Sequence, residues 1–168
     1  MLKNDFDRFK LRGDMPNTPV LKNVNLAVYL SGYTDGEGSF CISFSPRSKL
    51  KAKVEIRPSF SVSQNSDRAE VLYLFKEYFS CGFIRPDRSD KTYKFEVRSI
   101  KDIITKIIPH FKKFPLLSSK QKDFELFANI CEQIVKKDFK IKNVIPLAYK
   151  MNTSGKRKYT ADDLYSLL

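Results

Sequence analysis

Histidine and cysteine are scarce in this chain, and their scarcity removes several classes of function. The single histidine, His110, excludes most histidine-rich metal sites and any nuclease built on a cluster of histidines. The three cysteines, Cys41, Cys81 and Cys131, are widely spaced and form no CxxC pair. We therefore expect neither a zinc finger nor a disulfide framework, and a reduced compartment is the simplest interpretation. The chemistry of the protein must come from carboxylates, lysines, arginines and the backbone.

Long apolar runs are missing as well. No stretch of the sequence is long and apolar enough to span a bilayer, and we find no secretory signal with a hydrophobic centre. With 168 residues and 42% hydrophobic content, the chain is large enough for one compact domain with a core. Its formal net charge of +12 is typical of proteins that bind polyanions. Nucleic acid is the commonest such partner, and an anionic membrane or plain solubility is the alternative.

Periodicity divides the chain into an irregular arm at residues 1–24, a core at 25–138 and a helical tail at 139–168. The core reads α-β-β-α-β-β-α, which predicts an α+β fold with an antiparallel sheet and helices on one face. The predicted helices are residues 25–36, 67–78, 100–111 and 119–135. Asn25 is the expected cap of the first and Ser119 of the last, and Pro109 should interrupt the third. The predicted strands are residues 39–45, 54–64, 83–85 and 92–98. In the tail, Thr160 is the expected cap of the last helix.

One face of the predicted sheet is polar and basic. In residues 39–45 and 54–64, apolar and polar side chains alternate at a period of two, so one face packs on the core. Short hydroxyls with interspersed basic groups suit base edges and phosphates in a DNA groove, although such a face also suits water. The expected DNA contacts lie on this face, in the basic connector, at the start of the last core helix and in the tail: Cys41, Ser43, Ser45, Arg47, Lys49, Lys51, Glu55, Arg57, Ser59, Ser61, Ser63, Arg85, Arg88, Lys94, Glu96, Arg98, Lys122, Lys156, Arg157 and Lys158.

Residues 30–39, LSGYTDGEGS, are the most informative stretch of the sequence. Gly32 and Gly36 are one helical turn apart, and Ala27 and Ser31 lie on a neighbouring row, so two such helices can approach closely. Because glycine lowers helix stability, a close neighbour must compensate. Carbonyls at the helix end carry partial negative charge, and a carboxylate there forms a hard-oxygen site that suits magnesium. The alternatives are a turn into a hairpin and an EF-hand loop, which lacks the further carboxylates it needs.

This stretch resembles the LAGLIDADG motif of homing endonucleases, including its acid-Gly-acid-Gly ending. Members of that family follow the motif with two strands, a glutamine at the end of the second strand and a basic residue early in the next helix. This chain has Gln64 and Arg68 at those places. The family also carries a lysine before its last large helix, often in a Lys-Gln-Lys run, which corresponds to residues 120–122 here. The resemblance covers about residues 26–135.

The resemblance implies a role for each residue that matches the family's pattern. It makes Glu37 the metal-binding carboxylate and the Gly36 carbonyl a candidate second ligand. It makes Gln64 and Arg68 neighbours of the site that order water. It places Lys120 near the scissile phosphate, where the lysine offsets charge in the transition state. The expected catalytic residues are therefore Glu37, Gln64, Arg68 and Lys120.

A single copy of the motif also implies a dimer. The family places two such helices side by side, so a chain with one copy takes the second from another subunit, which gives a C2 homodimer and a nearly palindromic target. The implied interface residues are Ala27, Ser31, Gly32 and Asp35, with Asp35 holding the paired helix ends together. Two departures stand out: Ser31 replaces a common alanine, and Glu37 replaces a frequent aspartate, which leaves the metal geometry open.

Taken whole, the resemblance implies a site-specific, intron-encoded homing endonuclease on the αββαββα fold, whose sheet forms a saddle on double-stranded DNA. The implied cofactor is Mg²⁺, with Mn²⁺ substituting and Ca²⁺ binding without cleavage, and we expect no membrane partner and no small-molecule substrate. The host genome would be that of a chloroplast or mitochondrion, and the Lys, Asn, Ile, Phe and Tyr usage fits an AT-rich coding sequence. An RNA-binding intron maturase is one alternative, but it need not keep Glu37, Gln64 and Lys120 together. A non-catalytic DNA-binding regulator is the other, but such proteins usually append a separate DNA-binding domain.

Overall fold

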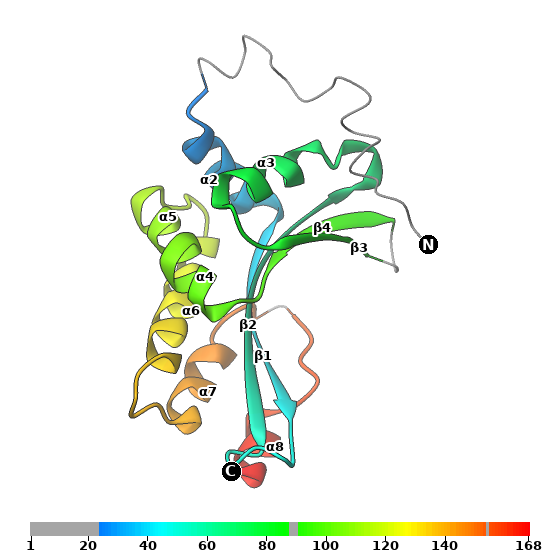
Figure 1. Cartoon of the computed structure of the whole chain (residues 1–168). Helices are drawn as coiled ribbons and strands as arrows, with labels where there is room; N and C mark the ends of the chain where they lie inside the picture. The colour runs from blue at the N-terminus through cyan, green and yellow to red at the C-terminus, as the bar shows by residue number, and fades with distance from the viewer. Residues whose placement is uncertain (1–23, 88–90, 154) are drawn as a thin grey trace.

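The computed structural model describes residues 24–87, 91–153 and 155–168 (Figure 1), so Arg88 and nearly all of the predicted arm lie outside the described residues. The strands are β1 (Gly38–Pro46), β2 (Val54–Asn65), β3 (Phe83–Pro86) and β4 (Thr92–Val97). The helices are α2 (Leu26–Glu37), α3 (Glu70–Phe79), α4 (Ile100–Asp102), α5 (Ile108–Lys113), α6 (Lys120–Ile134), α7 (Ile141–Tyr149) and α8 (Ala161–Leu167). A 3-10 turn, η2 (Ser66–Arg68), precedes α3, and a π turn, η3 (Ile103–Ile107), joins α4 to α5.

The motif runs from helix into strand without a linker. Asn25 caps α2 as predicted, because its side-chain oxygen accepts a hydrogen bond from the Val28 backbone N–H at 3.3 Å. The helix extends past Gly36 and ends at Gly38, whose backbone N–H donates to the Thr34 carbonyl. A Cβ at Gly38 would lie 2.7 Å from that carbonyl oxygen, so only glycine fits this junction. The fold therefore places the Glu37 carboxylate at the exact end of the helix, next to the sheet.

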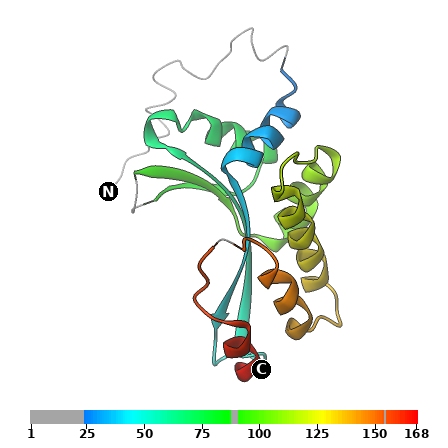
Figure 2. The same ribbon diagram turned by 180° about the vertical axis from the view of Figure 1, so that it is seen from behind.

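The sheet confirms the predicted α+β class. It is antiparallel in the order β1-β2-β4-β3. The alternation read from the sequence is also confirmed, since Phe40, Ile42, Phe60 and Val62 are buried while their neighbours along the strands are more exposed. Figures 1 and 2 show helices α2 to α7 on one side of the curved sheet, so the polar side chains of the strands face the other way.

Phenylalanine fills the space between sheet and helices. Phe40 of β1, Phe60 of β2 and Phe111 of α5 pack with ring centroids 5.2 to 5.4 Å apart, and Phe124 of α6 lies 5.3 Å from Phe40. All four rings are at most 2% exposed. Truncation of one such ring typically costs about 3–5 kcal/mol, so this cluster holds the sheet, α5 and α6 together.

Two local predictions are corrected by the structure. The helix predicted over 100–111 with an interruption at Pro109 continues to Lys113, and its irregular part is the π turn of η3, which ends just before Pro109, rather than Pro109 itself. Ser119 makes no capping bond at the start of α6. Instead the Ser118 hydroxyl accepts from the Lys120 backbone N–H at 3.1 Å.

The tail packs on the core. Val144 and Ala148 of α7 join the main cluster, whereas Leu164 of α8 forms a second cluster with Val54 and residues of α7. Thr160 caps α8 as predicted, through a capping box in which it exchanges hydrogen bonds with Asp163. Between α7 and α8 the chain crosses to the side of β1 and β2 away from α7 (Figures 1 and 2). None of the helices in the described ranges has the length and apolarity needed to cross a membrane.

Candidate active site and nucleic-acid interface

Lys120 closes the C-terminal end of α2. Its ammonium group donates hydrogen bonds to the carbonyl oxygens of Thr34 at 3.0 Å and Gly36 at 3.3 Å. Carbonyls in the last turn of a helix lack intrahelical partners and carry partial negative charge. Burial lowers the pKa of Lys120, and the nearby carboxylates of Asp35 and Glu37 act against this shift. A positive charge is thus held at the carbonyl that the sequence analysis assigned to a metal ion.

Asp35 ties the same helix end to the turn before α6. Its carboxylate accepts hydrogen bonds from the backbone N–H groups of Leu117 and Ser118, each at 2.9 Å, and from the Ser118 hydroxyl. Burial acts to raise the pKa of Asp35, but these hydrogen bonds and the Lys120 charge outweigh it and lower the pKa. The sequence analysis expected Asp35 to join two paired helices, whereas here its oxygens are used inside its own subunit.

Glu37 is the free acid of the motif. Its side chain is exposed, and it makes no hydrogen bond or ion pair to other residues in the described part of the chain. Its charge acts on both Tyr33 and Lys120, which shows that it lies near both groups. An exposed carboxylate beside a helix-end carbonyl offers hard oxygens of the kind that magnesium prefers. The described residues contain no cluster of three or more His, Cys, Asp or Glu side chains able to hold a metal.

Gln64 and Arg68 lie on the other side of this helix end. The Gln64 side-chain amide donates to the Tyr33 hydroxyl and so links the end of β2 to α2. Burial raises the pKa of Tyr33, although the bond from Gln64 opposes the shift, and the charges of Glu37 and Arg68 also act on this hydroxyl. The Arg68 side chain is 74% exposed, and its one ion pair to a described residue is a long one, 3.8 Å to Asp67 within η2. The structure therefore ties Gln64 to α2 through Tyr33 and Lys120 to α2 through its last carbonyls, and the charges of Glu37 and Arg68 both act on Tyr33. Tyr33 also lies at this helix end, and the sequence analysis assigned it no role.

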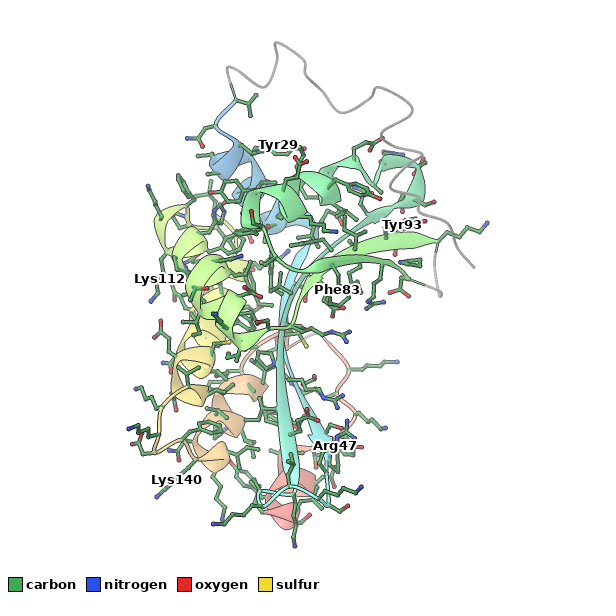
Figure 3. All side chains as sticks on the ribbon, in the orientation of Figure 1. Tyr29, Arg47, Phe83, Tyr93, Lys112 and Lys140 are labelled. Carbon is green, nitrogen blue, oxygen red and sulfur yellow. The ribbon has the colours of Figure 1, made fainter. Side chains whose placement is uncertain are left out.

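The face of the sheet away from the helices carries the predicted nucleic-acid contacts. Strand register sets Ser43 opposite Arg57, and Ser63 opposite Lys94, so hydroxyls and basic groups alternate across β1, β2 and β4. Arg47 lies at the far end of the β1–β2 hairpin, whereas Lys112 and Lys140 project from the helical side (Figure 3). The hydroxyls and basic groups of the strands thus lie on the face of the sheet opposite the core.

Arg157 differs from its neighbours in the tail. Its guanidinium group lies 4.6 Å from the centre of the Tyr149 ring, and it donates to the carbonyls of Ala148 and Met151 at the end of α7. This geometry closes a helix end, so Arg157 is held by its own subunit. The flanking Lys156 and Lys158 are exposed, and they remain the tail's candidates for phosphate contact.

Comparison with known proteins gives the family. Residues 30–131 match the family model described as LAGLIDADG endonuclease. The chain belongs to this family. The homing endonuclease I-ApeII of Aeropyrum pernix is 25% identical over 150 residues, which are 83% of this chain and 88% of the relative. The probable intron-encoded endonuclease 2 of Neurospora crassa is 29% identical over 103 residues. These residues are 61% of this chain but only 23% of that longer relative.

A solved structure supports the same assignment. The archaeal intron-encoded homing endonuclease I-Vdi141I, complexed with DNA, superposes with a TM-score of 0.76 at 26% identity. The similarity covers 84% of this chain and 92% of that chain. The fold of the LAGLIDADG family therefore extends beyond the matched motif to most of the described chain.

Within the LAGLIDADG helix, Ser31 has a local explanation. Its hydroxyl donates to the Phe114 carbonyl at 2.7 Å and lies 3.1 Å from the His110 Nε2. Because Ser31 donates its hydroxyl proton to Phe114, its oxygen can only accept from His110, so the His110 Nε2 carries the ring hydrogen. The His110 Nδ1 then accepts a hydrogen bond from the Tyr78 hydroxyl at 3.1 Å. Burial lowers the pKa of His110 to about 4, so the ring is neutral at pH 7. The Ser31 side chain therefore belongs to a buried hydrogen-bond network and not to the exposed surface of α2.

The exposed face of the LAGLIDADG helix is rotated from the expected one. Ala27 and Ser31 are buried in their own subunit, while Val28, Gly32 and Gly36 are exposed. A Cβ on either glycine would meet no described atom within 4 Å. An apolar groove of about 270 Å³ runs beside Gly32, and Leu117 on its wall is 93% exposed. The surface open to a second helix therefore keeps Gly32 but not Ala27 or Ser31.

Proposed function

We propose that this chain is a site-specific homing endonuclease that acts as a homodimer and cleaves both strands of a long, nearly palindromic DNA site. Its membership of the LAGLIDADG family supports the reaction class. The observation that carries the proposal is the end of α2. There the Glu37 carboxylate, without a hydrogen bond or ion pair among the described residues, acts electrostatically on Lys120 and on Tyr33, the hydroxyl that Gln64 binds.

The chemistry divides among these residues. Glu37 and the Gly36 carbonyl would hold a divalent cation, Mg²⁺ in the first place with Mn²⁺ as a substitute, and this ion would supply charge stabilisation at the scissile phosphate. Lys120 would turn from the helix end to the phosphate and offset its charge. Gln64 and Arg68 would order the solvent that carries the proton. The only imidazole of the chain, His110, is occupied in a buried network, which argues against a histidine base.

A second subunit would complete the site. The exposed glycines of α2 permit a close approach of two helices, and the apolar groove beside Gly32 offers further surface to bury. Two-fold symmetry about this contact would bring two Glu37 carboxylates together, one for each DNA strand. A symmetric dimer reads the same bases in both half-sites, hence the nearly palindromic target.

We further propose that the gene belongs to an intron of a chloroplast or mitochondrial genome. The similarity to a protein named as intron-encoded supports the intron, and the AT-rich residue usage supports the organelle. The product would then promote mobility of its own intron.

A cleavage assay tests the proposal. The protein is incubated with a library of intron-insertion sites in Mg²⁺, in Mn²⁺, in Ca²⁺ and with EDTA. We expect double-strand breaks at one site in Mg²⁺ and Mn²⁺, binding without breaks in Ca²⁺, and no breaks with EDTA. Binding of intron RNA without any DNA cleavage would instead support a maturase. DNA binding without cleavage under all conditions would support a regulator.

A further inference from the structure

Two acidic residues stand among the basic groups on the outer face of the sheet. Glu55 of β2 and Glu96 of β4 share the face of Ser43, Arg57 and Lys94, since their cross-strand partners are Ser45 and Ser61. Carboxylates on a DNA-facing surface repel phosphates and lower non-specific affinity. Their presence on a chain of net charge +12 therefore needs a cause other than attraction to DNA.

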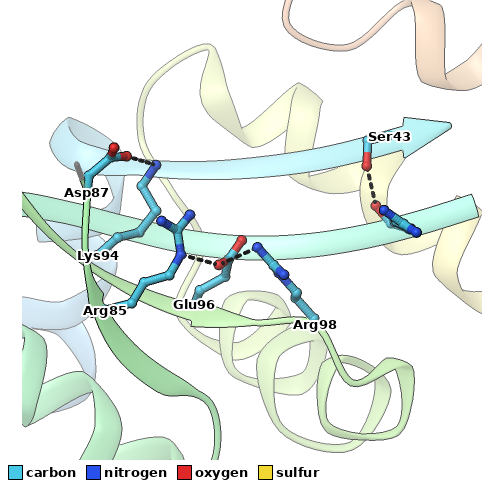
Figure 4. Close-up of polar contacts among 7 residues, drawn as sticks. Ser43, Arg85, Asp87, Lys94, Glu96 and Arg98 are labelled. Atoms are coloured by element: carbon cyan, nitrogen blue, oxygen red, sulfur yellow. Dashed lines mark hydrogen bonds and ion pairs between the residues drawn. The ribbon is translucent and has the colours of Figure 1, made fainter. Parts of the chain in front are cut away.

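Glu96 lies beneath two arginines. Its carboxylate accepts from Arg85 Nε at 3.0 Å and from Arg98 Nη2 at 2.9 Å (Figure 4). The Glu96 side chain is 8% exposed, whereas that of Arg98 is 60% exposed. Burial acts to raise the pKa of Glu96, but the two guanidinium groups outweigh it and lower the pKa, so the carboxylate stays charged. The acid is shielded, and the arginines form the surface.

Glu55 also binds two arginines, at the other end of the sheet, but its side chain is 37% exposed. It accepts from Arg47 Nε at 3.0 Å and from Arg57 Nη2 at 2.7 Å. Like the Glu96 cluster, it joins arginines from different positions on neighbouring backbone segments. In both clusters each arginine donates one N–H to the acid, and a guanidinium group has five. The remaining donors stay available to a partner.

A guanidinium group fixed before binding loses less rotational freedom when it meets its partner. The commonest specific contact of arginine in the major groove is the two-pronged one to O6 and N7 of guanine, which demands a defined plane. A free arginine on the same surface would contact any phosphate equally well. The clusters therefore favour reading of bases over general attraction.

We propose that Glu55 and Glu96 are positioning residues that hold two pairs of arginines ready for guanine bases in each half-site. They raise sequence preference and lower affinity for unrelated DNA. This inference rests on the proposed function, because it assigns the bases that the same surface reads. A purely structural ion pair would alter thermal stability and leave sequence preference unchanged.

The test is a selection from randomised DNA duplexes in Ca²⁺, read by sequencing, with full-length wild type, Glu96→Gln and Glu55→Gln. Glu132→Gln is the matched control, because Glu132 also forms an ion pair, at 2.7 Å to Lys112 on the helical side. All three variants remove one negative charge. For Glu96→Gln and Glu55→Gln we expect guanine preference to fall roughly 5- to 150-fold at separate positions of the motif, with equal or tighter binding to unrelated duplex. The control should keep the wild-type motif.

Further variants keep the test decisive. Arg98→Lys keeps the charge but not the planar fork, so it should lose the same guanines as Glu96→Gln. If thermal melting shows that Glu96→Gln is unfolded, the more exposed Glu55 cluster decides the matter alone. If folded Glu96→Gln and Glu55→Gln select the same DNA motif as wild type, this inference is overturned and the proposed function is not. A wild type that enriches no DNA motif would overturn the proposed function with it.

Discussion

Replacement of Lys120 by methionine should weaken the end of the motif helix by a measurable amount. Methionine keeps the length of the side chain but removes the donor to the Thr34 and Gly36 carbonyls. A hydrogen bond to a charged group contributes about 1.5–3 kcal/mol when it is buried. Lys120 is only partly buried, and the Thr34 carbonyl keeps its bond from the Gly38 N–H, so we expect a loss of about 1–2 kcal/mol.

The assay is urea denaturation of Lys120→Met beside Lys122→Met. Lys122 is exposed in the same helical turn, so its replacement should change the free energy of unfolding by no more than about 0.5 kcal/mol. Removal of the Lys120 charge should also tighten Ca²⁺ binding in calorimetry without DNA, because the ammonium no longer competes for the Gly36 carbonyl. Equal stability of the two variants, together with equal Ca²⁺ affinity, would refute the reasoning that Lys120 holds the helix end.

Three further changes probe the site, the dimer and the buried network. Glu37→Gln should keep target binding in Ca²⁺ and lose cleavage in Mg²⁺ by orders of magnitude; near-normal cutting would exclude Glu37 as the metal ligand. Gly32→Leu should yield monomers by light scattering, and a wild type that is already monomeric with and without target DNA would contradict the two-subunit site. The stability of wild type should fall as the pH drops from 6.5 towards 4, by up to about 1.4 kcal/mol per pH unit, because the unfolded chain binds a proton on His110 before the folded one does. His110→Gln should reduce that slope in urea titrations, and an unchanged slope would mean that the ring is already charged when folded.

The strands and the main helices could be predicted because their signals are local. Phe40 and Phe60 face the core for a reason visible within a few neighbouring residues, namely an alternation that matches the pleat of a strand. The helix cap of Asn25 and the capping box of Thr160 are equally local. Such features need no knowledge of what the rest of the chain does.

The missed features depend on residues far apart in the sequence. Ser118 rather than Ser119 closes the start of α6 because Ser118 is held in place by Asp35, 83 residues earlier. Likewise Tyr33 entered the site only through its bond from Gln64, which the fold brings to it. Helical periodicity shows that these side chains share a face, but it does not show which distant element covers that face.

The two acids of the motif have different surroundings for a simple geometric reason. Residues two apart on a helix point about 200° away from each other, so the side chains of Asp35 and Glu37 leave α2 on different sides. Asp35 faces the turn before α6, where three hydrogen bonds occupy its oxygens, and Lys120, the first residue of α6, reaches the helix-end carbonyls. The contacts of Asp35 fix α6 against α2, and thereby fix where Lys120 stands relative to Glu37. Asp35 therefore positions Lys120, while Glu37, on the other side of the helix, stays exposed. One short motif thus supplies both the residue that orders the site and the carboxylate proposed to bind the metal.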